Sequence, residues 1–355
     1  MNSDQMTLVV LTPAFPASES EVNWVPSQQL FLHSVRKQFP GIRIIVLSFI
    51  YPPTTSNYQW NGIKVLSFDG MNYRKLKRPF LWRHVWKKLS DINKSGKITS
   101  ILSFWCGECA LVGKYFGKRN SVKHFTWICG QDARSANKMV KLIRPLPDEL
   151  IAKSDFLADE FYRNHGIRPA HIITNGIDPL SFPVSASNRD IDIIAVGSLS
   201  VLKQYDIFLE VVAELKNSLP GIKATLCGDG EDTERLKKIR EDKSLTATVF
   251  MPGMLPPTDA IKLMQRAKIL LHPSSYEGFS MACLEALYAG CHVISFVKPM
   301  NHEIKNWHVV ETHEQMCKKS RELLLDPQTT YEPVLVYAMD DSVKKMMTLL
   351  GLAKY

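Results

Sequence analysis

The chain has 355 residues, 45% of them apolar, and a formal net charge of +9, which suits two α/β domains of ordinary size. No run of about 18 apolar residues occurs, so no transmembrane helix is expected. The amino-terminal segment lacks the basic region of a secretory signal, and the seven cysteines are irregularly spaced. These features predict reduced thiols in a cytosol.

The positive charge is unevenly distributed. Residues 1–188 carry a net charge of +11, whereas the remainder carries −2. This asymmetry indicates that the two halves meet different partners.

The first half alternates apolar runs with helical stretches. The runs predict strands at 7–11, 43–49, 63–66, 98–103 and 123–128, and a long helix is predicted from about 22 to 38. Strands that alternate with helices favour a mainly parallel sheet covered on both faces.

Residues 73–97 form a basic segment that carries nine Lys or Arg, with Phe80, Trp82 and Trp86 among them. Basic residues interleaved with aromatics can lie on an anionic membrane and act on a lipid-linked acceptor. They can also bind nucleic acid. A third interpretation is a solvated basic helix whose aromatics face the core.

The pair Cys106 and Cys109 follows a strand and opens a helix, like a thioredoxin redox motif. With His124 and Cys129 it also provides zinc-capable ligands, although the spacing fits no common zinc finger. Buried structural thiols are the remaining interpretation.

The second half contains a strand, turn, helix and strand unit within 269–296. An apolar strand precedes a turn at 272–278, Ser280 is suited to cap a helix over 281–289, and Gly290 is suited to end it. The free amides at the start of this helix suit a phosphate or a sugar oxygen.

Glu277-Gly278-Phe279-Ser280, followed by Leu284-Glu285-Ala286, resembles the E-x7-E signature of glycosyltransferase family 4. That family comprises retaining enzymes that use nucleotide sugars. The resemblance implies an α/β protein of GT-B architecture, with two Rossmann-like domains whose parallel sheets face each other across a cleft. It implies an acceptor-binding domain at 1–178, a linker at 179–190, a nucleotide-sugar domain at 191–335, and a carboxyl-terminal helix at 336–355 packing back on the first domain.

The same resemblance implies roles for individual residues. Glu277 and Lys203 are the expected catalytic residues, and Lys203 would stabilise the leaving diphosphate. Ser198 stands where relatives carry a second cation, an arginine. The implied substrate-binding residues are Glu285, Gly278, Phe279, Ser280, Met281, Gly197, Ser198, Gly228, Gly230, Met251, Pro252 and, in the first half, Asp132.

The resulting expectation is a retaining glycosyltransferase that moves a hexose from a UDP- or GDP-linked donor to a glycan or lipid-linked acceptor, in cell-surface polysaccharide or glycoconjugate synthesis. We expect neither a metal nor a cofactor apart from the donor. The expected location is the cytoplasm or the inner face of the membrane, without nucleic acid as a partner. The alternatives are a non-enzymatic nucleic-acid-binding protein that uses residues 73–97, and an NAD-dependent oxidoreductase, which the incomplete glycine fingerprint after Gly228 disfavours.

Overall fold

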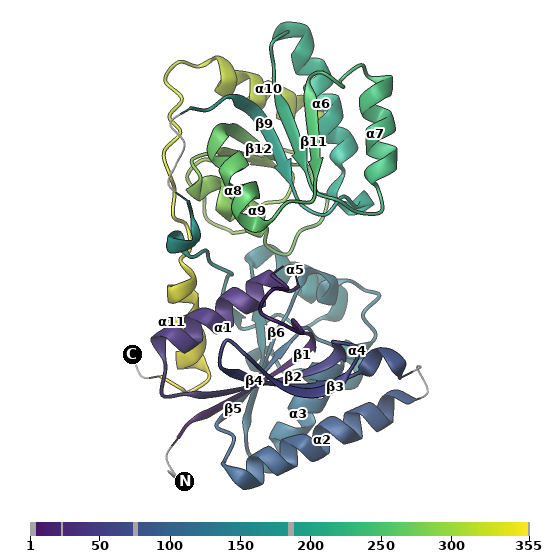
Figure 1. Ribbon diagram of the computed structural model, residues 1–355, viewed down its shortest axis with the longest axis vertical. Helices are drawn as coiled ribbons and strands as arrows, with labels where there is room; N and C mark the ends of the chain where they lie inside the picture. The colour runs from purple at the N-terminus through teal and green to yellow at the C-terminus, as the bar shows by residue number, and fades with distance from the viewer. Residues whose placement is uncertain (1–4, 23, 74–76, 184–187, 354–355) are drawn as a thin grey trace. The chain divides into compact units, whose positions relative to one another are not determined.

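The computed structural model describes residues 5–22, 24–73, 77–183 and 188–353, and the chain forms two units (Figure 1). The first unit runs to Asn175 and resumes at Met339, and the second unit is Gly176–Ala338. Residues 74–76 of the basic segment and residues 184–187 of the predicted linker lie outside the described residues. The domain limits inferred from the sequence stay predictions.

The sheet of the first unit has eight strands in the described part of the chain, in the order β3-β4-β2-β1-β5-β6-β7-β8. Neighbouring strands run parallel, except β3 and β4. The mainly parallel sheet predicted from the sequence is therefore confirmed. The strands are β1 Thr7–Ala14, β2 Arg43–Tyr51, β3 Thr55–Trp60, β4 Ile63–Phe68, β5 Ser100–Phe104, β6 Lys123–Trp127, β7 Leu150–Ala152 and β8 His171–Ile172.

Helices cover both faces of this sheet because successive strand residues point to opposite sides. Leu8 of β1 packs with Phe31 of α1 and Val343 of α11, whereas its neighbour Val9 packs with Leu81 of α2. The helices of this unit are α1 Pro26–Gln38, α2 Arg78–Ser95, α3 Glu108–Asn120, α4 Met139–Ile143, α5 Asp155–His165 and α11 Met339–Leu349.

Two local features differ from the sequence prediction. Helix α1 begins at Pro26 rather than near residue 22, in keeping with the preference of proline for the first helical position. Strand β3 was not predicted, because its residues are mostly polar. It pairs antiparallel with β4 through a turn at Asn61 and Gly62, both of which have positive φ, as a tight hairpin requires.

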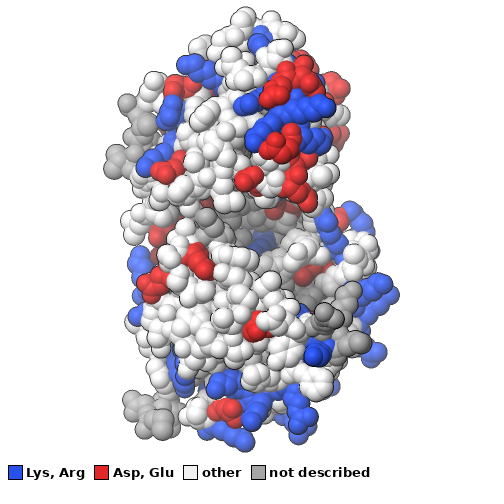
Figure 2. Space-filling model, turned by 45° about the vertical axis from the view of Figure 1, so that its right-hand side comes forward, with Lys and Arg blue, Asp and Glu red and all other residues white. Residues whose placement is uncertain are grey.

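Helix α2 carries most of the described part of the basic segment. Its apolar face, with Leu81 and Val85, is buried against the sheet, and Trp82 and Trp86 are half-buried against the same core. Phe80, in contrast, is 67% exposed. Figure 2 shows Lys and Arg side chains gathered at the lower end of this unit. The aromatic residues are therefore divided between the core and the surface.

The second unit is built on a sheet of six parallel strands, in the order β11-β10-β9-β12-β13-β14. Helices α6 and α10 cover one face, and α8 and α9 cover the other. The strands are β9 Ile191–Val196, β10 Ala224–Cys227, β11 Val249–Gly253, β12 Ala267–His272, β13 His292–Ser295 and β14 Trp307–Val309. The helices are α6 Tyr205–Ser218, α7 Thr233–Asp242, α8 Pro257–Arg266, α9 Met281–Tyr288 and α10 His313–Leu325.

Both units thus have the Rossmann-like organisation that the sequence predicted. None of the helices in the described ranges combines the length and the hydrophobicity that crossing a membrane requires.

Candidate active site

The predicted donor residues of the second unit gather at one edge of its sheet. Because the strands are parallel, their carboxyl ends meet at the same edge, which is where α/β proteins bind ligands. Gly197 follows β9, Gly228 follows β10, Met251 and Pro252 lie near the end of β11, and His272 ends β12. Residues at the carboxyl ends of four strands therefore lie along one edge of the sheet.

The two glycine loops run in contact with each other. Gly228 has φ +148°, and a Cβ on it would collide with the carbonyl oxygen of Gly197. A Cβ on Gly230 would collide with the backbone of Leu199. Any larger residue at Gly228 would force the loops apart, so glycine is needed here for close backbone approach.

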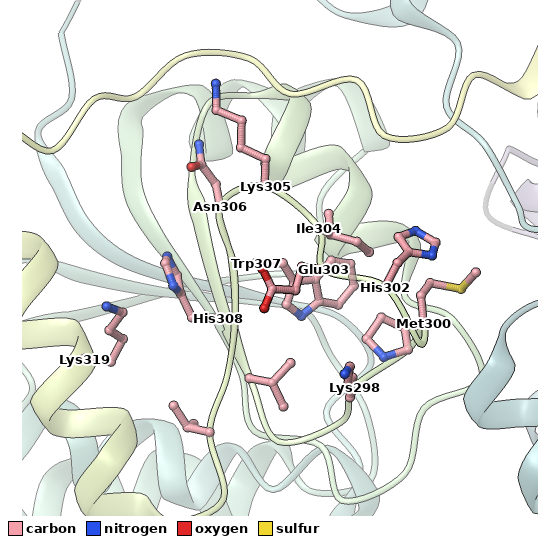
Figure 3. Close-up of a pocket in the computed structure, with 13 residues that line it drawn as sticks. Lys298, Met300, His302, Glu303, Ile304, Lys305, Asn306, Trp307, His308 and Lys319 are labelled. Carbon is pink, nitrogen blue, oxygen red and sulfur yellow. The ribbon is translucent and has the colours of Figure 1, made fainter.

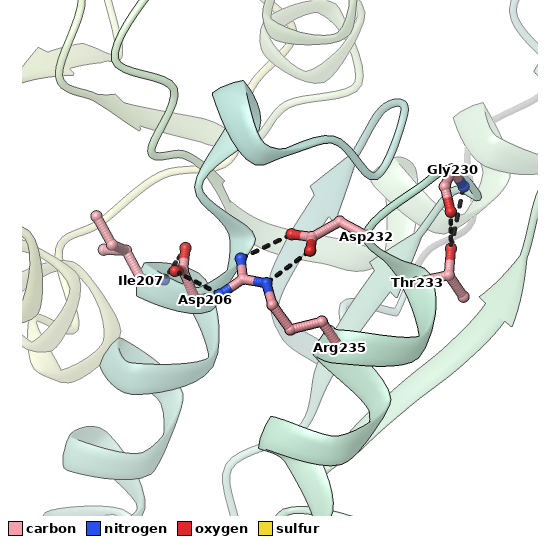
Figure 4. Close-up of polar contacts among 6 residues, drawn as sticks. All are labelled: Asp206, Ile207, Gly230, Asp232, Thr233 and Arg235. Carbon is pink, nitrogen blue, oxygen red and sulfur yellow. Dashed lines mark hydrogen bonds and ion pairs between the residues drawn. The ribbon is translucent and has the colours of Figure 1, made fainter.

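A charged cluster holds these loops against the helices that follow them (Figure 4). Arg235 of α7 donates to both carboxylate oxygens of Asp232, at 2.6 and 2.7 Å, and to Asp206 of α6 at 3.1 Å. The backbone N–H of Asp232 in turn donates to the carbonyl of Leu199. The bidentate pair orients the Arg235 guanidinium, and its single bond to Asp206 links the start of α7 to the start of α6.

Lys203, Glu277 and His272 form the polar centre of this edge. Lys203 ends a short 3₁₀ turn, Val201–Lys203, directly before α6, and its Nζ forms an ion pair with Glu277 Oε2. The buried imidazole Nε2 of His272 lies 3.5 Å from the same oxygen. The two predicted catalytic residues are thus in contact, although 74 positions separate them in the chain.

The pKa of Glu277 falls to about 2. Burial by itself would raise it, but the neighbouring His272 and the Lys203 ammonium favour the carboxylate more strongly. Burial lowers the pKa of His272, so its imidazole is neutral at pH 7. The Glu277 carboxylate is therefore ionised at neutral pH and pairs with the Lys203 side chain.

Two buried polar atoms in this region, Tyr205 Oη and Ser274 Oγ, have no hydrogen-bond partner among the described residues, and His272 Nε2 faces Glu277 Oε2 at 3.5 Å. Buried polar groups without partners are rare, and they are expected where a ligand completes the bonding. Tyr205, Ser274 and His272 were not predicted as site residues. The only sequence signal for His272 is its place at the end of the strand that precedes Glu277.

Helix α9 begins as the sequence predicted. Ser280 is its N-cap, and its side chain accepts a hydrogen bond from the backbone N–H of Cys283. Phe279, just before the cap, stacks on Trp307 with ring centroids 6.2 Å apart. Gly290, after the helix, has φ +88°. The Ser280 cap and the contact of Phe279 with Trp307 therefore fix the first turn of α9. The backbone amide of Met281 lies in this turn, close in the chain to Gly278 and Glu277.

Glu285 is on the same helix but has a different electrostatic environment. Burial raises the pKa of its half-buried carboxyl to about 7, and no neighbouring cation offsets that effect. The two carboxyls of the signature are thus pushed apart in pKa, one strongly acidic and one close to neutral, which is a pattern typical of functional carboxyl pairs.

Asp132 belongs to the first unit, where it lines a separate pocket of about 510 Å³. Its Oδ2 accepts a hydrogen bond of 2.8 Å from the backbone N–H of Cys129. Burial raises the pKa of Asp132 to about 6, despite that bond and the nearby Lys153. Trp105, Arg78 and neighbouring residues also line the pocket, so it offers an apolar wall with a few polar groups.

The Cys106 and Cys109 pair does not have the properties of a redox centre. Both thiols are free and buried, and burial raises the pKa of each. A redox-active cysteine instead needs a lowered pKa and access to solvent. The zinc interpretation fails as well, because these cysteines do not form a metal-ligand cluster with His124 or Cys129 within the described ranges.

A pocket of about 540 Å³ follows β13, where the loop carries Lys298 and His302 (Figure 3). Lys298, Lys305 and Lys319 lie on different sides of it. His302 Nε2 lies 3.0 Å from the Tyr337 hydroxyl. The cationic groups do not converge on one point, so this pocket lacks a cluster of charged groups in contact such as the one around Glu277.

Comparisons with known proteins agree with the geometry of the second unit. Residues 178–332 match the family model of the glycosyl transferases group 1. Glycogen synthase of Mycobacterium tuberculosis is 28% identical over 179 residues, which is 49% of this chain and 43% of that protein. The phosphatidylinositol N-acetylglucosaminyltransferase gpi3 subunit of Schizosaccharomyces pombe is 26% identical over 201 residues, 55% of this chain and 44% of that protein. The chain spans less than half the length of these curated relatives.

Solved structures resemble the whole chain. HepE from Anabaena, solved in complex with UDP and glucose, aligns with a TM-score of 0.66 at 15% identity and covers 98% of this chain and 97% of its own. Sucrose-phosphate synthase from Thermosynechococcus elongatus aligns with a TM-score of 0.68 at 15% identity and covers 98% of this chain and 96% of its own.

The fold is thus that of the GT-B glycosyltransferases. Within it, residues 178–332 belong to the glycosyl transferases group 1, and the recognition made from the E-x7-E motif is confirmed at that level. Assignment to family 4, the retaining outcome and the roles of single residues stay predictions.

Proposed function

We propose that this protein transfers a hexose from a UDP- or GDP-linked donor to a glycan or lipid-linked acceptor, with retention at the anomeric carbon, in cell-surface polysaccharide or glycoconjugate synthesis. The observation that carries the proposal is the cluster of Lys203, Glu277 and His272 at the carboxyl edge of the second sheet. Its charged pair lies beside polar atoms that have no partner among the described residues.

Each part of a nucleotide sugar has a group to meet in the second unit. Lys203 and the free amides at the start of α9 supply positive charge for the diphosphate. Before a donor binds, Lys203 is paired with Glu277. The donor therefore has to share or replace that partner, and Glu277 then becomes available to hexose hydroxyls.

Glu285 is suited to bind the ribose. An ionised carboxylate has two oxygens and accepts hydrogen bonds from two vicinal hydroxyls. In the absence of a ligand, burial disfavours that ionised form. Bonds donated by the ribose would stabilise the charge, so donor binding and ionisation of Glu285 support each other.

The proposal needs no metal ion at the donor, because Lys203 and the helix end already provide positive charge. Retention follows from the motif resemblance. A phosphate oxygen of the leaving diphosphate can accept the acceptor's proton on the face where attack occurs, while Lys203 stabilises the charge that the diphosphate gains.

The acceptor belongs with the first unit in this proposal. The pocket around Asp132 and Trp105 is of a size that binds small ligands. On α2, Phe80, Arg83 and Lys87 are exposed on the same helix, which is the combination of an apolar side chain and basic charge that binds anionic membranes. HepE is solved with UDP and glucose, which supports a nucleotide-sugar donor here. The name of the Schizosaccharomyces pombe relative refers to phosphatidylinositol, which supports a lipid-linked acceptor.

A thermal-shift screen against UDP, GDP, ADP and their sugars tests the donor. A ligand at a hundredfold its dissociation constant stabilises the folded state by about 2.7 kcal/mol, a shift of several degrees. We expect one nucleotide series to shift wild type and to shift a Lys203→Ala variant less. If no nucleotide or nucleotide sugar shifts the wild-type protein, the proposed function is wrong.

A further inference from the structure

A cluster of three potential metal ligands lies on the second unit, outside the residues assigned to the donor. His313 and Cys317 are one helical turn apart on α10, so they share a face of that helix. Glu214 reaches them from α6, which packs against α10 over the same face of the sheet. The group was not predicted from the sequence, because its members come from helices about a hundred residues apart.

The distances suit a shared ion. Cys317 Sγ lies 3.6 Å from His313 Nε2, and His313 Nδ1 lies 3.9 Å from Glu214 Oε2. One ligand atom from each residue can be chosen so that all three lie within 4.8 Å of one another. Tetrahedral zinc holds neighbouring ligand atoms about 3.5 Å apart. The two short distances above involve different imidazole nitrogens, and one ion binds only one of them, so the side chains would rotate to surround one ion. Within the described residues, no other group of three such side chains meets this condition.

The chemistry of the donor set selects the ion. A thiolate, an imidazole and a carboxylate together suit zinc, whereas calcium and magnesium prefer oxygen ligands alone. The side chains of Glu214 and His313 are 46% and 28% exposed, so an ion can enter from solvent and a water molecule can complete the fourth position.

An enzymatic interpretation of the same three residues fails on access. In the order thiol, imidazole and carboxylate they resemble a hydrolytic triad. Cys317, however, is only 1% exposed, and burial and Glu214 raise the pKa of its thiol to about 12. A thiol that is protonated and covered cannot attack a substrate carbonyl.

We propose that Glu214, His313 and Cys317 form a zinc site that braces α6 against α10. On binding, the S–H bond of Cys317 breaks, its proton passes to solvent, and a zinc–sulfur bond forms. The ion would act on stability rather than on transfer, because Glu214 is near the end of α6 and Lys203 precedes its start. The site is thus independent of the proposed transferase activity.

Cobalt is the probe, because thiolate-bound Co²⁺ has a charge-transfer absorption that Zn²⁺ abolishes by displacing it. Chelator-treated wild-type protein should bind one equivalent of Co²⁺ with this band, and Zn²⁺ should remove the band. Cys317→Ser should lose the band. His313→Gln and the exposed change Glu214→Gln should each weaken Zn²⁺ binding tenfold or more.

Glu210→Gln, on the exposed surface of α6 one turn before Glu214, is the matched control and should bind Co²⁺ and Zn²⁺ as wild type does. If Cys317→Ser does not fold, the two other ligand variants still decide the question. The proposal is overturned if wild type binds no Co²⁺, if the charge-transfer band persists without Cys317, or if Glu214→Gln and His313→Gln bind Zn²⁺ as tightly as the control.

Discussion

The raised pKa of Glu285 makes the stability of the ligand-free protein depend on pH. A carboxyl whose pKa rises on folding stabilises the fold below its unfolded pKa and loses that contribution as pH rises through the folded pKa. For Glu285 this window runs from the ordinary value of 4.5 to about 7. Near pH 8, the folded protein therefore contains a carboxylate whose charge is poorly solvated.

Glu285→Gln removes this charge and keeps the shape of the side chain. Each pKa unit corresponds to about 1.36 kcal/mol, so the full shift would be worth about 3 kcal/mol. Because the side chain is only half-buried, we expect the variant to gain about 1–2 kcal/mol over wild type at pH 8 and almost nothing at pH 4.5. For a unit of this size that is a rise of a few degrees in Tm.

The assay is thermal unfolding of both proteins, free of nucleotide, from pH 4.5 to 8, with the exposed change Glu210→Gln as control. Nucleotide affinity, measured by calorimetry at pH 8, should instead fall about tenfold or more in Glu285→Gln. The new amide offers the ribose one acceptor oxygen instead of two. A stability difference that does not change with pH would refute the buried-carboxyl reasoning. Unchanged nucleotide affinity in Glu285→Ala would remove the residue from the donor site.

Three further predictions concern the leaving diphosphate, the need for a metal, and membrane binding. Lys203→Ala should lower kcat at least tenfold, because the leaving diphosphate loses its cation. Ser198→Arg should leave kcat unchanged or raise it slightly. Steady-state kinetics in which Lys203→Ala equals wild type would contradict the role of Lys203. Transfer should continue in excess EDTA and give a product whose anomeric proton coupling matches the donor; loss of activity in EDTA, or an inverted coupling, would disprove the metal-free or the retaining assignment. Replacing Arg83, Lys87 and Lys88 by Glu should abolish flotation with anionic liposomes and leave donor binding unchanged. The same change at Lys237, Lys238 and Lys243 of the second unit is the control and should leave flotation unchanged. A wild-type protein that fails to float shows that α2 is only a basic surface.

The amino-acid sequence determined the local parts of this protein, because their causes lie within a few residues. Ser280 caps α9 through a backbone amide three positions on, and Gly290 takes the positive φ that follows the helix. The alternation of apolar runs with helices in the first half likewise predicted a mainly parallel sheet there, since each run must be buried on both faces. The polar strand β3 escaped prediction because it is stabilised by pairing with β4 rather than by its own apolar pattern.

The tertiary structure alone decided which distant residues meet and how they ionise. The sheet order places β12 beside β9, and this brings Glu277 and His272 to Lys203. The sequence marked Glu277 and Glu285 as the two carboxylates of one motif, but it gave no sign of how each of them ionises. Their surroundings alone make their pKa values differ. Neighbouring His272 and Lys203 lower the pKa of Glu277, whereas burial raises the pKa of Glu285. Glu214, His313 and Cys317 likewise meet only because α6 and α10 cover the same face of the sheet, a long-range packing that no local pattern specifies.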